Sequence, residues 1–484
     1  MTDGPSATGA WETVVGLEVH CELRTETKLF CSCRNAFGEA PNTLVCPVCL
    51  GLPGSLPVLN RAAVELAMRI GTALHSDIRP SVFHRKNYFY PDMPKDYQIT
   101  QYDEPICVGG WLEVPDGPRV GIVRAHLEED TGKSTHVGET GRIHEATASL
   151  VDYNRAGVPL VEIVSAPDLR SGEQARQYVE GLREILVAIG ASDGRMEEGS
   201  LRVDANVSVR PAGSADLGTR CEVKNLNSLR SLARAVLWEA ERQVRLLAEG
   251  GVVQQETRHW DEEAGRTVLA RSKEEAEDYR YFPEPDLVPV VPEAEWVARV
   301  RAELPPLPAE RRAKVAALLG GNGLSAGAGA QVATVVELGL DDLVVGAVEK
   351  GAEARLAVAR AANELAASPE AARSLEPEAF RALLAMEADG KLSATQAKEV
   401  LGEQVRRRGG DPAAIAREKG FEAMGTDALA DAVEQVVTTH PDEWDRYRAG
   451  EDQLSGWFVG QVMRLTGKRA DGKAVIALLR ERRG

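Results

Sequence analysis

The segment Leu201–Arg210 alternates between apolar and polar side chains without a break. Its apolar members are Leu201, Val203, Ala205, Val207 and Val209. Its polar members are Arg202, Asp204, Asn206, Ser208 and Arg210. Because successive side chains of a β-strand point to opposite faces, this period of two predicts a strand with one buried and one polar face. The chain should therefore contain a sheet that is covered on one face and solvated on the other.

Three more segments repeat this pattern, each with charged groups at the polar positions. These positions are Glu18 and His20; then Arg124, His126 and Glu128, followed by Glu129 and Asp130; and then Glu222 and Lys224. In addition, Glu162 interrupts an apolar run from Val158 to Val164, where a carboxylate is unexpected. An ordinary half-solvated sheet explains each strand taken alone.

Taken together, these strands predict a concave acidic floor on one sheet. Hard carboxylate oxygens suit Mg²⁺, which bridges carboxylates to the phosphates of ATP. Neighbouring Arg and Lys side chains would hold the phosphates themselves. The pattern thus indicates a phosphoryl-transfer site built without a glycine-rich loop. Gly132-Lys133-Ser134 resembles the end of a P-loop, but position 127 is Leu, so the first glycine of that motif is missing.

Four of the seven cysteines form a cluster along the chain. Cys31 and Cys33 precede Cys46 and Cys49 by twelve residues. Two close pairs joined by a loop can surround one ion, and four thiolates in a tetrahedron suit a structural zinc with no open position. Buried, metal-free cysteines are the alternative. The remaining three, Cys21, Cys107 and Cys221, are interpreted as packing residues.

Three domains are predicted, preceded by a disordered leader at residues 1–10. An α+β body covers residues 11–295, an all-α middle domain residues 296–408 and a small all-α tail residues 409–484. The boundaries are marked by proline-rich segments near 288–292 and 304–308 and by the Arg-Gly-rich segment 406–412. Within the body, Ser171 and Gln174 form a capping box before an apolar helical face, and Gly190 ends that helix.

Composition excludes some classes of protein. No stretch approaches the roughly 18 consecutive apolar residues of a membrane span, and the first ten residues do not form a signal peptide, so a cytoplasmic protein is expected. The net charge of -17 argues against broad coating of nucleic acid. The last residues are nevertheless locally basic, with Arg464, Lys468, Arg469, Lys473, Arg480, Arg482 and Arg483.

Many long segments of this sequence resemble those of the GatB/GatE family of tRNA-dependent amidotransferase subunits. They cover the body almost continuously and reappear in the tail. They are Gly16–His20, Lys28–Cys31, Pro41–Thr43, Cys46–Gly54, Lys86–Asp92, Tyr97–Ile99, His126–Asp130, Asn154–Leu160, Glu197–Arg202, Asp204–Ser208, Lys224–Ser228, Asp278–Asp286 and Gly456–Met463.

The resemblance implies a glutamine synthetase-like antiparallel sheet and a division of labour in a heterotrimer. An A-type amidase (glutaminase) subunit would release ammonia from glutamine, and a small C-type subunit would clasp the other two. This chain would bind misacylated Glu-tRNA(Gln), Asp-tRNA(Asn) or both, phosphorylate the aminoacyl carboxylate with ATP and let ammonia displace phosphate. Such a reaction needs positioning and charge neutralisation rather than an enzyme nucleophile, which agrees with the absence of a nucleophile motif.

The resemblance also implies roles for individual residues. The predicted Mg²⁺ ligands or their immediate neighbours are Glu18, His20, Glu128 and Glu162. Arg202 is expected to contact phosphate, with Asp204 and Asn206 beside the metal. An ammonia channel is expected to involve Lys86, Lys95 and Glu129. A structural histidine at position 20 and an ordinary surface lysine at position 95 are the alternatives.

The tail is the predicted grip on tRNA. Arg464, Lys468, Arg469 and Lys473 follow one helix and are expected to contact tRNA. Its apolar residues should form the core of the tail rather than stack on bases: Leu454, Trp457, Phe458, Val462 and Leu465.

Two other functions compete with this prediction. The first is a non-catalytic tRNA-binding scaffold with a structural zinc, against which the acidic strand faces argue, because sheets that face RNA should be basic or aromatic. The second is a free-standing amide ligase of the ATP-grasp type acting on a small molecule. The basic tail argues against that ligase, since a small substrate has no use for it.

Overall fold

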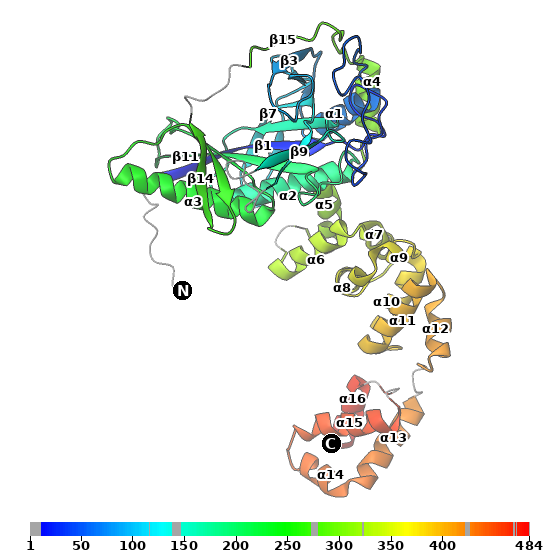
Figure 1. Cartoon of the computed structure of the whole chain (residues 1–484). Coiled ribbons are helices and arrows are strands. Elements are labelled where there is room, and N and C mark those ends of the chain that lie inside the picture. The colour runs from blue at the N-terminus through cyan, green and yellow to red at the C-terminus, as the bar shows by residue number, and fades with distance from the viewer. Residues whose placement is uncertain are drawn as a thin grey trace. The chain divides into compact units, whose positions relative to one another are not determined.

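The computed structural model describes residues 11–115, 117–137, 147–272, 279–321, 324–421, 426–467, 470 and 472–483. The predicted leader at residues 1–10 lies outside this set. The chain divides into two compact units after Leu307. The first is a mixed sheet and helix body, and the second is helical (Figure 1). No helix in the described ranges is long and apolar enough to cross a membrane.

A 13-stranded sheet forms the centre of the described body. Its neighbours pair antiparallel except β12 and β13, which are parallel. The spatial order is β14 (Arg266–Ser272), β13 (Glu256–Asp261), β12 (Cys221–Lys224), β11 (Leu201–Pro211), β1 (Trp11–Glu22), β10 (Pro159–Ser165), β7 (Arg119–Glu129), β4 (Tyr97–Gln101), β3 (Phe83–Asn87) and β15 (Phe282–Pro283). Three short strands pair beside this path, β2 (Asp77–Ile78), β5 (Cys107–Val108) and β6 (Trp111–Glu113). A separate two-stranded antiparallel sheet consists of β8 (Lys133–Val137) and β9 (Ala148–Asp152).

The predicted alternation sets the register of the central strands. Glu18 lies opposite Asp204 and His20 opposite Arg202, so β1 and β11 place their polar side chains on one face. Residues directly opposite in an antiparallel pair point to the same side, and the apolar positions therefore share the other side. Leu17, Val19 and Val203 are all nearly fully buried there. The sequence prediction of a sheet with one polar face is confirmed.

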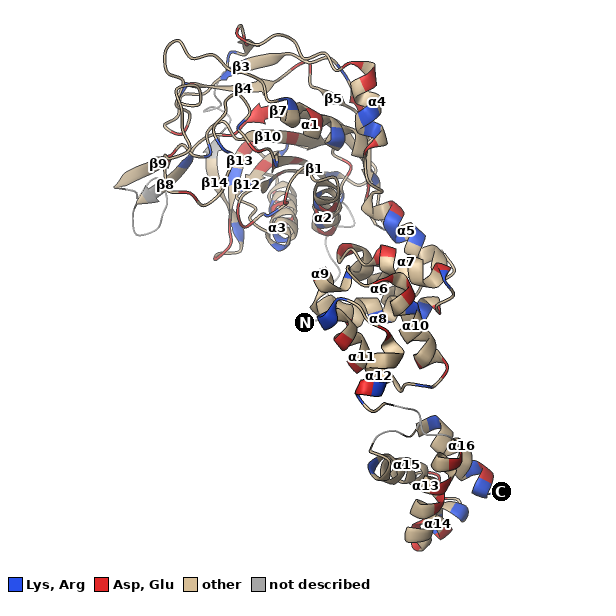
Figure 2. Cartoon of the chain, turned by 90° about the vertical axis from the view of Figure 1, so that its right-hand side faces the viewer, with Lys and Arg blue, Asp and Glu red and all other residues tan. Residues whose placement is uncertain are grey.

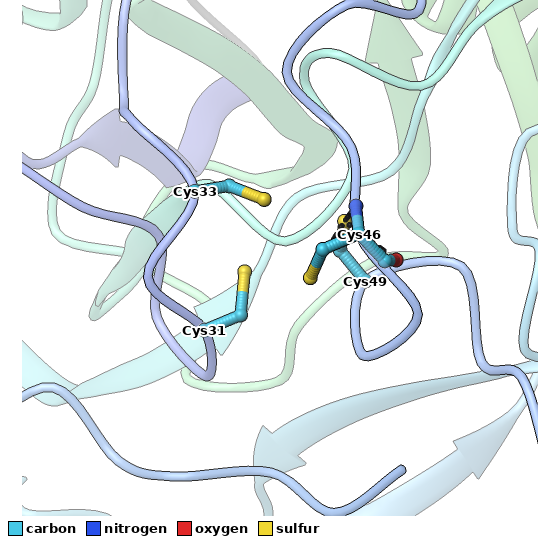
Figure 3. Close-up of side chains that lie close together, drawn as sticks. All are labelled: Cys31, Cys33, Cys46 and Cys49. Atoms are coloured by element: carbon cyan, nitrogen blue, oxygen red, sulfur yellow. Dashed lines mark hydrogen bonds between the residues drawn. The ribbon is translucent and has the colours of Figure 1, made fainter.

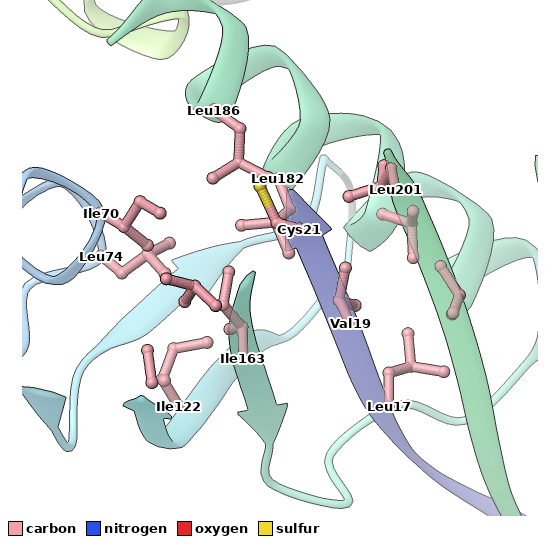
Figure 4. Close-up of a cluster of buried hydrophobic side chains, with 14 of the residues drawn as sticks. Leu17, Val19, Cys21, Ile70, Leu74, Ile122, Ile163, Leu182, Leu186 and Leu201 are labelled. Atoms are coloured by element: carbon pink, nitrogen blue, oxygen red, sulfur yellow. The ribbon is translucent and has the colours of Figure 1, made fainter. Parts of the chain in front are cut away.

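Helices cover the apolar face. They are α1 (Arg61–Ala73), α2 (Gly172–Ala188) and α3 (Leu229–Ala248), which contact the sheet, and α4 (Ala294–Ala302), which packs on α1. Leu182 and Leu186 of α2 meet Cys21 and Leu201 of the sheet in one cluster, together with Ile70 of α1 (Figure 4).

The predicted helix start at Ser171 is correct, but its capping box is only half formed. Ser171 Oγ accepts from the Gln174 amide at 3.1 Å, whereas the Gln174 carboxamide accepts from the amide of Arg170 rather than of Ser171. Gly190 follows the helix with φ +70°, a conformation that glycine adopts at little cost and that ends the helix as predicted.

The second unit contains thirteen short helical elements in its described residues. They are α5 (Pro308–Leu318), α6 (Ala326–Glu337), α7 (Asp341–Glu349), α8 (Ala354–Asn363), the 3-10 turn η4 (Leu365–Ala367), α9 (Pro369–Ala372), α10 (Pro377–Ala388), α11 (Ala394–Arg407), α12 (Pro412–Glu418), α13 (Thr426–Thr439), α14 (Pro441–Arg448), α15 (Leu454–Leu465) and α16 (Gly472–Arg483).

The buried apolar residues of this unit form two separate clusters. One runs from Val315 to Ala416 and includes Ile415 of α12. The other runs from Leu429 to Leu479. The predicted end of the body at residue 295 falls inside α4, whose Val300 belongs to the body's core because α4 packs on α1. The division of the chain into three domains remains a prediction.

Candidate functional site

The polar face of the sheet gathers His20, Glu128 and Glu162 into one group. His20 Nε2 lies 3.8 Å from Glu128 Oε1 and 3.9 Å from Glu162 Oε2. Strand pairing explains this contact, because His20 is opposite Glu162 and Glu162 is opposite His126, two residues before Glu128. One ligand atom from each of the three residues lies within 4.8 Å of the other two. An octahedral ion with bonds of about 2.1 Å places its ligands about 3 to 4.2 Å apart, so the group fits Mg²⁺.

His126, which the sequence prediction did not include among the site residues, lies between the two carboxylates. Its Nε2 is 3.2 Å from Glu162 Oε2 and 3.7 Å from Glu128 Oε2. Burial lowers the pKa of His126, but the two carboxylates outweigh burial and raise this pKa to about 9. For Glu128 and Glu162 burial raises the pKa, but the hydrogen bond with His126 opposes it, and the net pKa of both is lowered. These pKa shifts favour two ionised carboxylates around a protonated, buried His126.

A second acidic group lies beside the first on β1, β11 and β12. One carboxylate oxygen each of Glu18, Asp204 and Glu222 lies within 4.8 Å of the others. Asn206 Nδ2 donates to Glu18 Oε1 at 2.9 Å. Burial, followed by the charge of Glu162, raises the pKa of Glu18, so the two groups influence each other electrostatically.

Lys224 neutralises part of this second group. Its ammonium lies 2.8 Å from Asp204 Oδ2 and 3.0 Å from Glu222 Oε1. Burial lowers the pKa of Lys224, but Asp204 and Glu222 reverse this and raise it. The predicted metal ligands therefore separate into His20, Glu128 and Glu162 on one side and Glu18 with Asp204 on the other. Glu222 and Lys224 were not among the predicted site residues, although their alternation on β12 gave the same signal as on β1 and β11.

Arg202, the predicted phosphate contact, lies on the same face and binds a buried carboxylate. Its guanidinium is 2.5 Å from Asp130 Oδ2, and Arg155 Nε lies 3.6 Å from the same oxygen. Glu22 lies beside the same Asp130 carboxylate, and burial together with Asp130 raises the pKa of Glu22 to about 8. Arg202 Nε has no hydrogen-bond partner among the described residues. Asp130 thus holds the guanidinium in place, and because Nε is itself buried, a further contact would be made by the terminal nitrogens of this 34% exposed side chain.

The predicted channel residues Lys95 and Glu129 form a buried ion pair. Their side chains are 7% and 2% exposed. The Glu129 carboxylate also accepts from the amide of Ile99 at 2.9 Å. The interpretation of Lys95 as an ordinary surface lysine is therefore wrong. Lys86 contacts an aromatic ring instead, with its ammonium 4.6 Å from the centroid of Tyr279.

The four clustered cysteines converge from two loops (Figure 3). The Sγ atoms of Cys46 and Cys49 lie 3.9 Å apart, close to the edge of about 3.8 Å expected for a tetrahedron with Zn–S bonds of about 2.3 Å. A hydrogen bond from the Cys31 thiol lowers the pKa of Cys49 to about 5, while burial raises the pKa of Cys33 to about 11. The cluster therefore fits one zinc ion, whose charge would favour the thiolate form of all four side chains.

The predicted tail residues lie partly on exposed helices. Arg464 at the end of α15 and Lys473 in α16 are exposed, whereas Lys468 and Arg469 lie outside the described residues. Lys and Arg are frequent at the end of α16 (Figure 2). Phe458 and Val462 are buried in the core, and Trp457 packs against Phe458 and His440, as predicted. Leu465 is 47% exposed, so its predicted place in that core is wrong.

Comparison with known proteins gives a consistent result along the chain. The family model described as "GatB/GatE catalytic domain" matches residues 13–298, and the model described as "GatB domain" matches residues 342–482. The aspartyl/glutamyl-tRNA(Asn/Gln) amidotransferase B subunit of Frankia casuarinae is 50% identical over 98% of this chain and 96% of its own. The B subunits of the same description from Mycobacterium avium and Mycobacterium tuberculosis are each 48% identical over 99% of this chain, and over 97% and 96% of their own.

Proposed function

Because the chain belongs to the GatB/GatE family of aminoacyl-tRNA amidotransferase subunits, we propose that the polar face of its sheet activates the substrate carboxylate with ATP. As the B subunit of such a ligase, the protein acts in protein biosynthesis, within a multi-subunit enzyme that forms Gln-tRNA and Asn-tRNA. The observation that carries the proposal is the pair of acidic groups around His20 and Glu18 on one sheet face. Because these acidic groups lie on one face of a largely antiparallel sheet, a glutamine synthetase-like body is also proposed.

The proposed reaction balances in two steps. A carboxylate oxygen of the esterified Glu or Asp attacks the γ-phosphorus of ATP, the bond to the β-phosphate oxygen breaks, and ADP leaves. Ammonia then attacks the carbonyl carbon of the acyl phosphate, phosphate leaves with the bonding pair, and the amide nitrogen loses a proton. Neither step requires an enzyme nucleophile, because orientation and charge neutralisation lower the barriers.

The chain's own residues would divide this work. His20, Glu128 and Glu162, with Glu18 and Asp204 beside them, would hold Mg²⁺, which neutralises phosphate charge when bound. Positioning of both metal-facing carboxylates is the role proposed for His126. The terminal nitrogens of the 34% exposed Arg202 side chain would contact a phosphate oxygen, and Asp130 holds that guanidinium toward the sheet face.

Delivery of ammonia is proposed to pass the buried Lys95–Glu129 pair, with Lys86 at the mouth of the route. A heterotrimer with an A-type amidase subunit, which hydrolyses glutamine, and a small C-type subunit would supply that ammonia. Structural Zn²⁺ on the four cysteines would brace the loop that covers Lys95, since a Cβ added at Gly51 would overlap the Lys95 side chain. All seven cysteines are free of disulfides, which suits the reducing cytoplasm as the proposed location.

Recognition of the misacylated tRNA is proposed for the tail at residues 409–484, through exposed cations such as Arg464. The acidic sheet face argues against a scaffold that binds RNA on its sheet. A ligase for a small molecule would have no use for the basic helical end. Glu-tRNA(Gln) and Asp-tRNA(Asn) are both proposed substrates.

The assembled amidotransferase provides the test. In Glu128→Gln the carboxamide cannot hold a cation as the carboxylate does, and we expect ADP formation dependent on misacylated tRNA to fall at least about 100-fold, the scale of losing a transition-state charge contact. Glu241→Gln, on the exposed side of α3, is the matched control and should retain wild-type rates. Near wild-type phosphorylation in Glu128→Gln would refute the site.

A further inference from the structure

Three tyrosines gather at the side of the polar face formed by β4, β3 and β15. The rings of Tyr102 and Tyr281 are parallel, with centroids 4.0 Å apart and planes 7° apart. Tyr279 meets Tyr281 edge-on at 6.1 Å and 70°. Tyr102 remains 51% exposed although Tyr281 covers one of its faces. We call these three residues the tyrosine platform. His84 also meets Tyr102 edge-on at 6.0 Å and 71°, and the exposed half of Tyr102 is the part that a further flat ring could contact.

The loop that carries two of these rings is held in an unusual backbone conformation. Arg280, between Tyr279 and Tyr281, has φ +43°, which side chains with a Cβ adopt only at a cost. Asn87 Nδ2 compensates by donating to the carbonyls of Tyr279 at 3.0 Å and Arg280 at 2.8 Å. The Asn87 amide also donates to the Tyr279 carbonyl at 3.0 Å. The platform is thus fixed by a polar clamp from β3.

Strand register places the platform next to the His20, Glu128 and Glu162 group. Thr100 of β4 is opposite Glu128 of β7, and its hydroxyl donates to Glu128 Oε2 at 3.2 Å. Tyr102 is the first residue after β4, two positions beyond Thr100, which places it next to Glu128 along the chain direction of this strand. Burial, and then the charge of Glu128, raises the pKa of the Tyr281 phenol, which agrees with this proximity. One strand spacing of about 4.8 Å separates β4 from β7.

We propose, as an extension of the proposed function, that the tyrosine platform binds the adenine ring of a substrate adenosine beside the phosphoryl-transfer site. Aromatic side chains stack on bases through their π faces, and Tyr102 offers such a face within a nucleotide's length of the metal-binding group. ATP and the charged tRNA each carry an adenosine that could bind there. ATP is an adenosine nucleotide, and the aminoacyl group is esterified to the 3′-terminal adenosine of tRNA. Lys86, which stands over Tyr279, adds a cation for an adjacent phosphate.

Two binding comparisons with the assembled amidotransferase distinguish the two adenosines. The first measures the Kd of ATP against that of inorganic tripolyphosphate, each with Mg²⁺. The second measures the Kd of uncharged tRNA with a complete CCA end against the same tRNA lacking its terminal adenosine. In each comparison we take the Kd of the ligand without the adenosine divided by the Kd of the ligand with it. This ratio isolates the contribution of one adenosine, because all other contacts are shared.

Tyr102→Ala should reduce one of these two ratios by about 10-fold or more, the scale of one base–aromatic stack. A reduced ATP ratio assigns the platform to ATP, and a reduced tRNA ratio assigns it to the terminal adenosine. Tyr102→Phe retains the ring and should retain both ratios. Tyr90→Ala removes a ring that stacks on Tyr88 instead and should leave both ratios at the wild-type value.

Unchanged ratios in Tyr102→Ala, or ratios that fall equally in Tyr90→Ala, would overturn the platform. Since Tyr102 is half exposed, its replacement should leave the thermal midpoint of the complex unchanged, and a fall in both ratios with a lowered midpoint would also count against it. Failure of the proposed function is distinguishable, because the wild-type complex would then show no Mg²⁺-dependent ATP binding at all.

Discussion

His126 Nε2 and Glu162 Oε2 lie 3.2 Å apart on adjacent strands, with His126 almost fully surrounded by protein. Without a bound cation, the imidazolium is the nearest positive charge for two carboxylates that would otherwise repel each other. The histidine therefore preserves the arrangement of Glu128 and Glu162 before a metal ion arrives. This role is structural as well as electrostatic, and it has a pH signature.

For the metal-free chain we expect stability that depends on His126. The pKa rises from 6.5 to about 9 on folding, so the imidazolium stabilises the fold fully below pH 6.5 and loses that effect as pH rises through about 9. The contribution is at most about 3 kcal/mol. Urea unfolding with chelator across this window should show a fall in wild-type stability that His126→Gln lacks. Parallel pH profiles in the two proteins would contradict the assignment.

Loss of one clustered thiol should release zinc. Cys46→Ser leaves three thiolates, which hold Zn²⁺ less tightly, and we expect a lower metal content and a lower melting temperature. Metal analysis of purified wild-type chain should give one zinc ion per chain. Cys221→Ala, whose thiol lies against the Gln254 carbonyl, should retain the metal. A wild-type protein without zinc would refute the prediction.

Removal of the Glu129 carboxylate should uncouple the two half reactions. Glu129→Gln leaves the buried Lys95 ammonium without a counter-charge, at a cost of about 3 to 5 kcal/mol if the lysine stays charged. Glutamine should still be hydrolysed while glutamine-supported amidation falls, and external ammonium should support amidation better than glutamine does. Equal rates with the two nitrogen sources would exclude a role in ammonia delivery. Lys95→Met combined with Glu129→Gln removes both charges and should recover stability without recovering transfer.

Deletion of the last apolar cluster should weaken tRNA binding. Ile415 belongs to the apolar cluster that begins at Val315, so the deletion should begin at residue 422 rather than at 412 to leave that cluster intact. We expect lower affinity for tRNA and intact ATP binding. For Arg464→Ala the slope of log affinity against log salt should fall by about 1 if the residue contacts phosphate. Arg355→Ala, an exposed arginine of α8 outside the proposed tail, should keep the wild-type slope. Identical slopes for Arg464→Ala and wild type would remove this residue from the interface.

Local alternation predicted the polar and buried faces of β1 and β11, because the period of two depends only on neighbouring residues. Which strands lie side by side depends on pairing between distant segments, and this is where the sequence prediction failed to resolve the site. In the sequence Glu162 is only an unexpected carboxylate in an apolar run, and its place in the site depends on the pairing with His126. Tyr281 meets Tyr102 through a clamp from Asn87, nearly 200 positions away, and no local pattern encodes that contact.

The tail shows the same limit at a helix end. Helical spacing grouped Leu465 with Val462 and Phe458, yet Leu465 is the last residue of α15 and is 47% exposed there. Periodicity indicates which side of a helix is apolar, but not how far along the helix a partner extends.

The metal-facing and core-facing residues of β1 are interleaved one by one, so catalysis and folding share a single alignment. An insertion of one residue before Leu17 would turn Glu18 and His20 into the apolar core and expose Leu17 and Val19. Such a shift would displace the whole site at once, because β1 pairs with β10 on one side and with β11 on the other, and both pairings depend on the same register. Inherited length changes should therefore accumulate outside this strand and be absent within it.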